Sequence, residues 1–307
     1  MLSRAFASLG LVWALAGSPS ALAAARAGKT DQSTTKRTTK RTTKRTKNSK
    51  TAEVAAEATG PSAAEIESLR QTLIGADDEE SGEAADKLAN AGTARAAEPL
   101  LEVLAEGGRP LRVQAALDAL GKLGAAHVLR NDQAVVDALV LYAGHRAPDI
   151  RRRAVKALGN VSDPRVTGPL MDRLGDAAPD VRAAAADALA ARHEPRAVPR
   201  LFALLSRGDA GVASALASLA TPDMVPRIAE LAGTVDDELV ANTLGDYVKR
   251  DDVPEKLRID VLRTIGRLSG AVATTALAEY LASVPAKEDR ASKREAQKLL
   301  DQRGGTP

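Results

Sequence analysis

The sequence contains no cysteine, and only 2% of its residues are aromatic. The absence of cysteine excludes disulfide bonds, thiolate metal sites, a thiol nucleophile and an acylated lipoprotein cysteine. A compact α/β enzyme usually fills its core with more aromatic bulk than this chain provides. Runs that alternate apolar and polar residues with the period of a β-strand are also missing. These absences favour an all-α protein whose helices pack closely through small and aliphatic side chains.

The chain also has few residues of the kinds that carry enzyme chemistry. His127, His145 and His193 are its only histidines, and their spacing matches no metal-binding motif. There is no nucleophile elbow, no phosphate-binding loop and no glycine fingerprint for dinucleotides. The acidic run at residues 77–80 is interpreted as a solvated helix start rather than a cation site. We therefore expect no catalytic residue, no metal, no cofactor and no enzymatic activity.

The charge of the chain is divided unevenly. The formal net charge is +3. Residues 51–307 contain 32 Lys or Arg and 39 Asp or Glu, a net charge of −7. Residues 24–50 contain ten Lys or Arg and one Asp, a net charge of +9. A mildly acidic body is thus preceded by a strongly basic segment, and the two parts are expected to differ in structure and in role.

Residues 1–23 have the pattern of a secretory signal peptide. Arg4 supplies the positive start, Ala5 to Gly17 is a 13-residue apolar run, and Ala21-Leu22-Ala23 offers a cleavage site. The run is shorter than the about 20 residues that a membrane-spanning helix needs, although an uncleaved anchor remains the alternative. We predict an exported protein of the periplasm or of the cell surface and extracellular space.

Residues 24–60 form a linker rich in Thr, Lys and Arg, which we expect to be disordered because like charges repel and Thr forms helices poorly. The motif TTKR recurs within residues 34–46. Two interpretations remain open: a solvated spacer, or a segment that adheres to a polyanion such as lipopolysaccharide, a cell-wall polymer, a membrane surface or nucleic acid. Nucleic acid is disfavoured because the segment has no aromatic residue to stack on bases. The candidate polyanion-binding residues are Lys36, Arg37, Lys40, Arg41, Lys44 and Arg45.

The rest of the chain is organised around a repeated unit. The sequence PDIR beginning at Pro148 recurs as PDVR at Pro179, 31 residues later, and further positions match at the same offset. A fixed period in the range of about 20–50 residues is typical of a solenoid. We predict that residues 61–302 form such an array with capping helices at its ends, and that residues 303–307 are a disordered tail.

The ends of the array are marked by their own patterns. Ser62 and Glu65 have the spacing of a capping box, so a first helix is expected from about residue 62. Residues 292–301 have the charged, amphipathic pattern of a terminal capping helix. Between these ends, the unit degenerates after residue 209. A helix is expected at Asp237 to Lys249, but the pairing of helices within 210–250 is left open.

Two polar positions of the unit are interpreted as structural. Asp149 and Asp180 each follow a proline at a helix start, where a carboxylate can accept hydrogen bonds from free amides. Arg151 and Arg182 lie two residues further on, and in a stacked array each could reach an aspartate of the next unit. Alanines within the unit allow close approach of helices, and leucines supply the buried surface.

These repeats resemble the HEAT repeat, specifically the short bacterial HEAT-like repeats also found in proteins of the phycobilisome-lyase type. The resemblance implies antiparallel helix pairs stacked into a right-handed α-solenoid whose second helices line a concave face. It also implies a binding scaffold more often than an enzyme. The candidate partner-binding residues on the second helices are Glu98, Glu102, Asp172, Arg173, Arg200, Arg227 and Glu230.

Three functions follow as hypotheses. The first is an exported, non-enzymatic scaffold that binds a protein or peptide through the solenoid, with the basic segment contacting anionic surfaces. The second is a polyanion-binding envelope protein. The third, which rests on the family resemblance alone, is a subunit of a bilin-lyase-like enzyme. For the first, Phe202 and Tyr142 are the best aromatic anchors if they point outward, although Phe202 is expected in the core.

Overall fold

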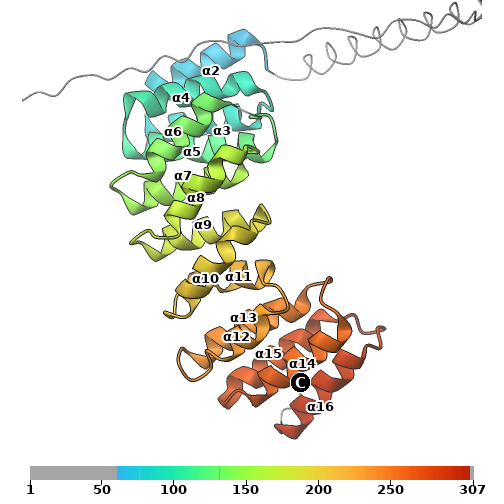
Figure 1. The fold of residues 1–307 in the computed structure, drawn as a ribbon. Coiled ribbons are helices and arrows are strands. Elements are labelled where there is room, and N and C mark those ends of the chain that lie inside the picture. The colour runs from blue at the N-terminus through green and yellow to red at the C-terminus, as the bar shows by residue number, and fades with distance from the viewer. Residues whose placement is uncertain (1–60, 76, 131, 305–307) are drawn as a thin grey trace, which may run out of the picture. The chain divides into compact units, whose positions relative to one another are not determined.

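The computed structural model describes residues 61–75, 77–130 and 132–304. The chain divides into two units, Met1–Thr59 and Gly60–Pro307, and every described residue lies in the second. The signal peptide and the whole basic linker expected from the sequence therefore lie outside the described residues. Within the described part, the chain is helical throughout and has no β-strand (Figure 1).

The described residues form fifteen α-helices, several of them preceded by a short 3-10 turn. Their bounds are α2 Ala63–Gly75, α3 Asp78–Asn90, α4 Ala97–Glu106, α5 Pro110–Ala125, α6 Gln133–Ala143, α7 Pro148–Asn160, α8 Thr167–Arg173, α9 Pro179–Ala191, α10 Val198–Leu205, α11 Ala213–Leu219, α12 Met224–Ala229, α13 Asp237–Lys249, α14 Glu255–Arg267, α15 Gly270–Ser283 and α16 Ala291–Gln302.

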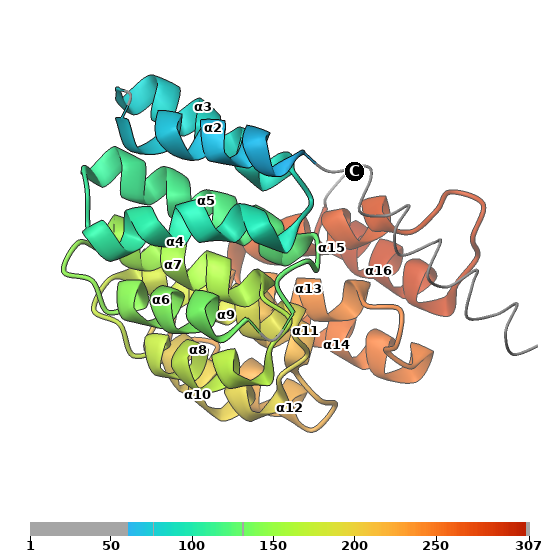
Figure 2. The ribbon, with the colours of Figure 1, turned by 90° about the horizontal axis from the view of Figure 1, so that it is seen from above.

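The helices alternate between two layers. In the odd layer, α3, α5, α7, α9, α11, α13 and α15 each pack against the next odd helix. In the even layer, α2 packs against α4, α4 against α6, and α14 against α16. Contacts such as α4 with α5 and α12 with α13 join the layers, and Figures 1 and 2 show the pairs stacked in chain order. The predicted all-α solenoid of stacked antiparallel helix pairs is confirmed.

Small residues set the spacing within the odd layer. A Cβ added at Gly159 of α7 would lie 2.6 Å from the Cβ of Ala188 in α9, so the two helices meet where one has no side chain. Gly121 of α5 lies similarly close to Ala157 of α7. Fully buried leucines such as Leu158 fill the space between the layers. The scarcity of aromatic residues thus accompanies close packing of helices.

Several helix starts are capped as the sequence suggests. The Ser62 amide donates to Glu65 Oε2 at 2.6 Å, and the Glu65 amide donates to Ser62 Oγ at 3.2 Å, which is the predicted capping box. Asp77 accepts hydrogen bonds from the amides of Glu79 and Glu80. The acidic run there is therefore a helix start, as expected.

The capping role predicted for Asp149 and Asp180 is wrong. The residues at the cap positions of α7 and α9 are Ala147 and Ala178, and neither cap involves a side-chain hydrogen bond. Each aspartate comes after the first-turn proline, inside the helix, and is exposed to solvent. An aspartate that follows the first helical residue complements the helix dipole. It is not at the N-cap, however, and the N-cap is the position from which a side chain can accept hydrogen bonds from the free amides.

The region from 210 to 250, whose pairing the sequence left open, contains α11, α12 and α13. The helix predicted at Asp237 to Lys249 is α13, with the same bounds. It packs against α11 on one side and α15 on the other, so it continues the odd layer. The next helix, α14, packs against α13, α15 and α16 and belongs to the even layer.

The arginine pattern of the repeat nevertheless reappears in α14. Arg151 and Arg182, in the odd helices α7 and α9, donate to the carbonyl oxygens of the residues five positions earlier, Arg146 and Ala177. Arg258 of α14 likewise donates to the carbonyl of Val253, at 3.0 Å. Helix α13 thus shifts the repeat by one helix, and the arginine-bearing helix changes from the odd layer to the even layer.

A search for membrane-spanning helices covered the described ranges 61–75, 77–130 and 132–304. No helix in them is long and apolar enough to cross a membrane.

Candidate functional site

The even helices carry the partner-binding residues that the sequence proposed. Glu98 lies on α4, Asp172 and Arg173 on α8, Arg200 on α10 and Arg227 on α12. Glu230 follows α12 directly. Of the whole set, the exposed members are Glu98, Asp172, Arg200, Arg227 and Glu230. We call the surface formed by these five residues the even-helix surface.

Two of the proposed residues are held in contacts that stabilise the array. Glu102 receives hydrogen bonds of 2.6 and 2.7 Å from Arg70 of α2, which joins α2 to α4. The Arg70 hydrogen bonds keep the pKa of Glu102 below its ordinary value. Arg173 is half-buried and donates to the carbonyl oxygen of Ala143, at 3.0 Å. Both side chains therefore have intramolecular partners, and neither is fully exposed.

The aromatic anchors differ in accessibility. Tyr142 is buried, and its hydroxyl donates to the carbonyl oxygen of Leu104 at 2.6 Å, so it braces α6 against α4. Phe202 is half-buried rather than a full core residue, and the guanidinium carbon of Arg227 lies 4.6 Å from its ring centroid. This cation–π contact links α12 to α10 and leaves part of the aromatic ring at the even-helix surface.

A chain of ion pairs runs along the repeats beside this surface. Arg151 binds Asp176 with hydrogen bonds of 2.8 and 2.6 Å, and Arg182 binds Asp209 at 2.5 Å. The predicted contact between each arginine and the aspartate of the next unit is wrong. Asp176 and Asp209 lie in the loops that end the arginines' own units, and Arg151 does not bind Asp180.

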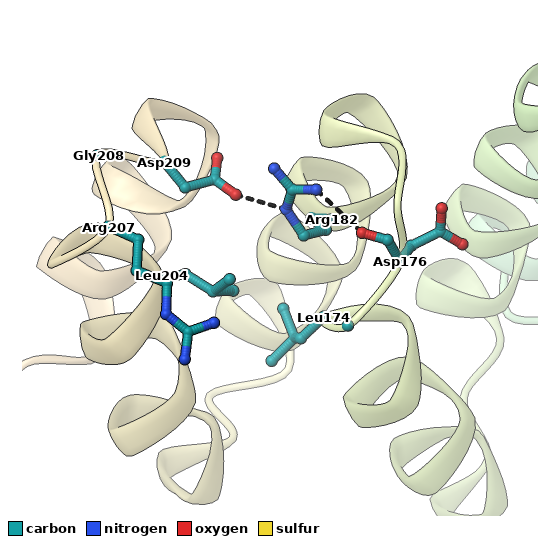
Figure 3. Close-up of a pocket in the computed structure, with 8 residues that line it drawn as sticks. Leu174, Asp176, Arg182, Leu204, Arg207, Gly208 and Asp209 are labelled. Carbon is teal, nitrogen blue, oxygen red and sulfur yellow. Dashed lines mark hydrogen bonds and ion pairs between the residues drawn. The ribbon is translucent and has the colours of Figure 1, made fainter.

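The same ion pairs border one of the pockets of the array. This pocket has a volume of about 360 Å³ and lies between the loops that follow α8 and α10 (Figure 3). Arg182 lies between Asp209 and Asp176 in it, bonded to the Asp209 carboxylate and to the Asp176 backbone carbonyl. We call it the inter-repeat pocket.

The second pocket, of about 300 Å³, lies between α2 and α4. Ile66 and Pro99 form part of its wall, and Glu98 is one of the charged residues that line it. Both pockets therefore involve even helices, and both occur where one repeat meets the next.

Acidic residues that cap the 3-10 turns before α8 and α10 were not identified from the sequence. Asp163 is 1% exposed and accepts hydrogen bonds from the Arg165 side chain and amide. Glu194 binds Arg196 in the same way in the next repeat. The Arg196 side chain holds the pKa of Glu194 at about 2, well below its ordinary value. The tripeptides Asp-Pro-Arg and Glu-Pro-Arg, one per repeat, are the signal that could have found this contact.

The charge is distributed unequally along the array. Residues 61–106, which comprise α2 to α4, contain three Lys or Arg and eleven Asp or Glu, a net charge of −8. Residues 107–304 contain 29 Lys or Arg and 26 Asp or Glu, a net charge of +3. The inter-repeat pocket lies in this second part. The first three helices are therefore strongly acidic, whereas the charge of the rest of the array is nearly balanced.

The remaining candidate residues of the sequence fall into two groups. The polyanion-binding candidates between Lys36 and Arg45 lie outside the described residues. The histidines are separated: His127 contacts Ser162, His145 accepts from the Ala147 amide, and His193 is exposed. Across the described ranges, no group of three or more His, Asp or Glu side chains is arranged to hold a metal ion.

Comparisons with solved structures show the fold. A homology model of the full-length AP-3 complex, in an intermediate open conformation, matches with a TM-score of 0.50 at 13% identity, over 76% of this chain and 50% of that chain. This chain thus spans about half the length of that protein. At such identity the likeness concerns the fold alone.

Other similar structures have lower TM-scores. The complex of CpcE and CpcF of phycocyanin lyase from Nostoc sp. PCC7120 matches at 22% identity with a TM-score of 0.42, over 79% of this chain and 96% of that chain. A designed armadillo repeat protein in complex with the peptide (KR)4 matches at 16% identity with a TM-score of 0.35, over 76% and 97%.

Sequence comparison identifies the repeats themselves. A search of curated proteins gives no significant match. The family model for HEAT repeats matches residues 136–220 and 167–244, which include α7 to α10, where the ion pairs recur. Residues 136–244 are therefore similar to HEAT repeats, and the stacked helix pairs agree with this likeness.

Proposed function

We propose that this chain is an exported, non-enzymatic scaffold that binds a protein or peptide partner along the even-helix surface. The observation that carries the proposal is the recurrence of exposed charged side chains on the even helices α4, α8 and α10 and directly after α12. Glu98, Asp172, Arg200 and Glu230 are exposed and have no ion pair within the described residues. Charged groups that are free of intramolecular partners at regular intervals can recognise an extended segment of another chain.

The pockets support binding rather than catalysis. In the inter-repeat pocket, Asp176 and Asp209 are held by Arg151 and Arg182. In the pocket between α2 and α4, Glu67 and Glu102 are held by Arg70, and Glu98 is the one lining carboxylate without an ion pair in the described residues. A general acid or base needs a carboxylate that can exchange protons with a substrate, and the four paired carboxylates accept hydrogen bonds from arginines of the array instead. This supports the proposal that the protein is not an enzyme.

Site-specific photo-crosslinking tests the surface. A photoreactive phenylalanine analogue is placed at Arg200 or at Glu230 and, as a matched control, at the exposed Lys156 of the odd helix α7. Cells are irradiated, and crosslinked chains are purified from the envelope fraction. We expect the same partner at Arg200 and Glu230 and none at Lys156. Equal crosslinking from Lys156, or none from both even-helix positions, would contradict the proposal.

Export and the role of the basic segment form a second part of the proposal. They are supported by the signal-peptide pattern and by the net charge of +9 in residues 24–50. Cell fractionation with amino-terminal sequencing tests export: a full-length chain in the cytosol would overturn it. Deletion of residues 30–50 tests adhesion: we expect salt-sensitive binding to lipopolysaccharide that the deletion removes. Unchanged, salt-independent binding after the deletion would refute adhesion.

The bilin-lyase alternative is separated by a direct assay. It rests on the family resemblance alone, because no acid–base pair free of arginine partners was identified in either pocket. A purified sample is incubated with a bilin and an acceptor protein, and covalent attachment is followed by absorbance. We expect no transfer above the uncatalysed rate, and catalysed transfer would replace the scaffold proposal.

A further inference from the structure

The inter-repeat pocket has an apolar floor beneath a polar rim. Leu174 is fully buried and Leu204 is half-buried, and both line the pocket. Gly175 and Gly208, one from each loop, leave backbone rather than side chains at the pocket wall. Figure 3 shows the two leucines between the two loops, with Arg207 beside them. The space therefore suits a side chain with both apolar and polar atoms.

The carboxylates of the pocket are already neutralised. The side chain of Asp176 is 4% exposed, and it accepts hydrogen bonds from Arg151 and from the Ala178 amide. The side chain of Asp209 is 9% exposed, and it accepts from Arg182 and from the Gly211 amide. Each aspartate is thus matched by an arginine, and these four residues together add no net charge to the pocket.

Two further arginines at this place have no such match. Arg207 lines the pocket and is exposed. Arg200, seven residues earlier on α10, is also exposed. A Cβ on Gly175 would lie 2.5 Å from Arg200 Nη2, so the Arg200 guanidinium lies against the pocket wall. Within the described residues, neither guanidinium has an ion pair or hydrogen bond, whereas most arginines of the array do.

We propose that the inter-repeat pocket binds an acidic, leucine-containing segment of the partner, with a carboxylate held by Arg200 and Arg207 and an apolar side chain over Leu174 and Leu204. This rests on the scaffold function proposed above and names the chemistry of its partner. Guanidinium groups match carboxylates in geometry as well as in charge. The uncompensated positive charge of the pocket comes from these two side chains.

A nucleic-acid backbone fits the same arginines less well. No aromatic side chain lines the pocket, so bases have no ring to stack on. The exposed carboxylates of Asp172 and Asp180 lie on the neighbouring helices α8 and α9 and would repel a continuous row of phosphates. A peptide carries its charges singly and can place an apolar side chain between them. An oligonucleotide is therefore included in the test as the competing outcome.

The test is fluorescence anisotropy with labelled probes of known composition. The probe is a short fluorescein-labelled peptide of alternating glutamate and leucine. The matched probes replace every glutamate by glutamine or by lysine, and a fourth is a labelled single-stranded oligothymidine. With the purified mature chain, we expect the glutamate peptide to bind about tenfold more tightly than the glutamine peptide and to weaken as salt rises.

Three substitutions locate the binding on the protein. We expect Arg200→Ala and Arg207→Ala each to weaken the glutamate peptide about five- to tenfold. Gly175→Ala should also weaken it, because the new methyl group displaces the Arg200 guanidinium. The matched control is Arg267→Ala in α14, which also removes an exposed arginine without an ion pair in the described residues. Its affinity should equal that of the parent chain, and circular dichroism confirms that all variants fold.

The proposal is overturned if the wild-type chain does not bind the glutamate peptide, if the glutamine peptide binds equally well, or if Arg207→Ala and Arg267→Ala have the same effect. Tighter binding of oligothymidine through Arg200 and Arg207 overturns it in favour of nucleic acid. The scaffold function fails separately, through crosslinking at Lys156 or through its absence at both even-helix positions. If a partner crosslinks at Arg200 but the chain binds the glutamate and glutamine peptides equally well, only the inference is refuted and the scaffold function stands.

Discussion

The guanidinium of Arg151 in α7 binds the carboxylate of Asp176, in the loop between α8 and α9, with hydrogen bonds of 2.8 and 2.6 Å. The arginine side chain is 14% exposed and the aspartate side chain 4% exposed. Arg182 and Asp209 repeat the contact one unit further along. These pairs join each inter-repeat loop to the first helix of the preceding pair, and their burial makes them sensitive to the loss of one partner.

We expect Asp176→Ala to lower the free energy of unfolding by about 3 kcal/mol, because it leaves the half-buried Arg151 without its counter-charge. Asp180→Ala serves as the control, since this aspartate is exposed and should change stability by less than about 0.5 kcal/mol. Urea unfolding followed by circular dichroism measures both. Equal effects of the two substitutions would show that the Arg151 contact contributes nothing.

The pH dependence of stability should reveal the pair of Glu194 and Arg196. The hydrogen bond from Arg196 lowers the pKa of Glu194 from 4.5 to about 2 in the folded chain. A carboxyl group with a depressed folded pKa stabilises the fold above its unfolded pKa, and it loses this contribution as pH falls through the folded value. The contribution of Glu194 is therefore complete above pH 4.5 and is lost between pH 4.5 and about 2.

The measurement compares the unfolding free energy of the parent chain with that of Glu194→Gln from neutral pH to about pH 2. The parent should be the more stable near neutral pH, and the difference should shrink as pH falls through this window. The subtraction removes the titration of other carboxylates, such as Asp163 and Asp176. A difference that is independent of pH would show that Arg196 does not perturb Glu194.

Replacing glycine by alanine should have opposite effects on stability at Gly159, where α7 meets α9, and at Gly82 in α3. Gly159→Ala gains helix propensity, but its Cβ would lie 2.6 Å from that of Ala188, so we expect a net loss of about 1–2 kcal/mol. Gly82→Ala in α3 meets nothing within 4 Å and should gain about 0.5–1 kcal/mol. Thermal unfolding of the two variants measures the sign. A stabilised Gly159→Ala would show that the helices separate easily.

The buried hydroxyl of Tyr142 offers a test of the contact between α6 and α4. Tyr142→Phe removes the donor that binds the Leu104 carbonyl at 2.6 Å, while the ring and its packing remain. We expect a loss of about 1–2 kcal/mol in unfolding free energy. Peptide-resolved hydrogen exchange should show faster exchange in α4 and α6 but not in α15. Uniform acceleration throughout the chain would mean that the hydroxyl has no local role.

Much of the fold could be predicted because the residues that determine each helix pair lie close together in the sequence. The apolar spacing and the turn residues of a helix pair lie within one unit, and α13 was expected with its observed bounds of Asp237 and Lys249. The capping box of Ser62 and Glu65 was found for the same reason, since its two residues are three positions apart.

Contacts between repeats were only partly predictable. The sequence indicated that Arg151 and Arg182 reach the aspartate of the next unit, but each binds an aspartate in the loop that ends its own unit. The choice between Asp176 and Asp180 depends on where the loop places its carboxylate, 25 residues from Arg151 in the chain, and residue spacing alone does not contain that information. A carboxylate of the loop can fold back toward the first helix of its own repeat, whereas Asp180 is fixed on an exposed helix turn.

The candidate site shows the same division. The even helices were identified as the binding surface from their polar residues, and five of the seven proposed residues are exposed. The sequence did not show that Glu102 is bound by Arg70, because that pair connects two helices 32 positions apart. Nor did it show the importance of Arg207, since the absence of a partner is visible only when the surrounding side chains are placed.

Helix α13 inserts a single helix, rather than a helix pair, between the two regular parts of the array. Duplicating or deleting a helix pair keeps every later helix in its own layer. Adding or removing a single helix moves every later helix to the opposite layer. Arg151 and Arg258 therefore occupy helices of opposite layers although they make the same backbone contact. Engineered grafts between the two parts must be made in whole pairs on one side of α13, or the grafted binding face will point to the other side of the array.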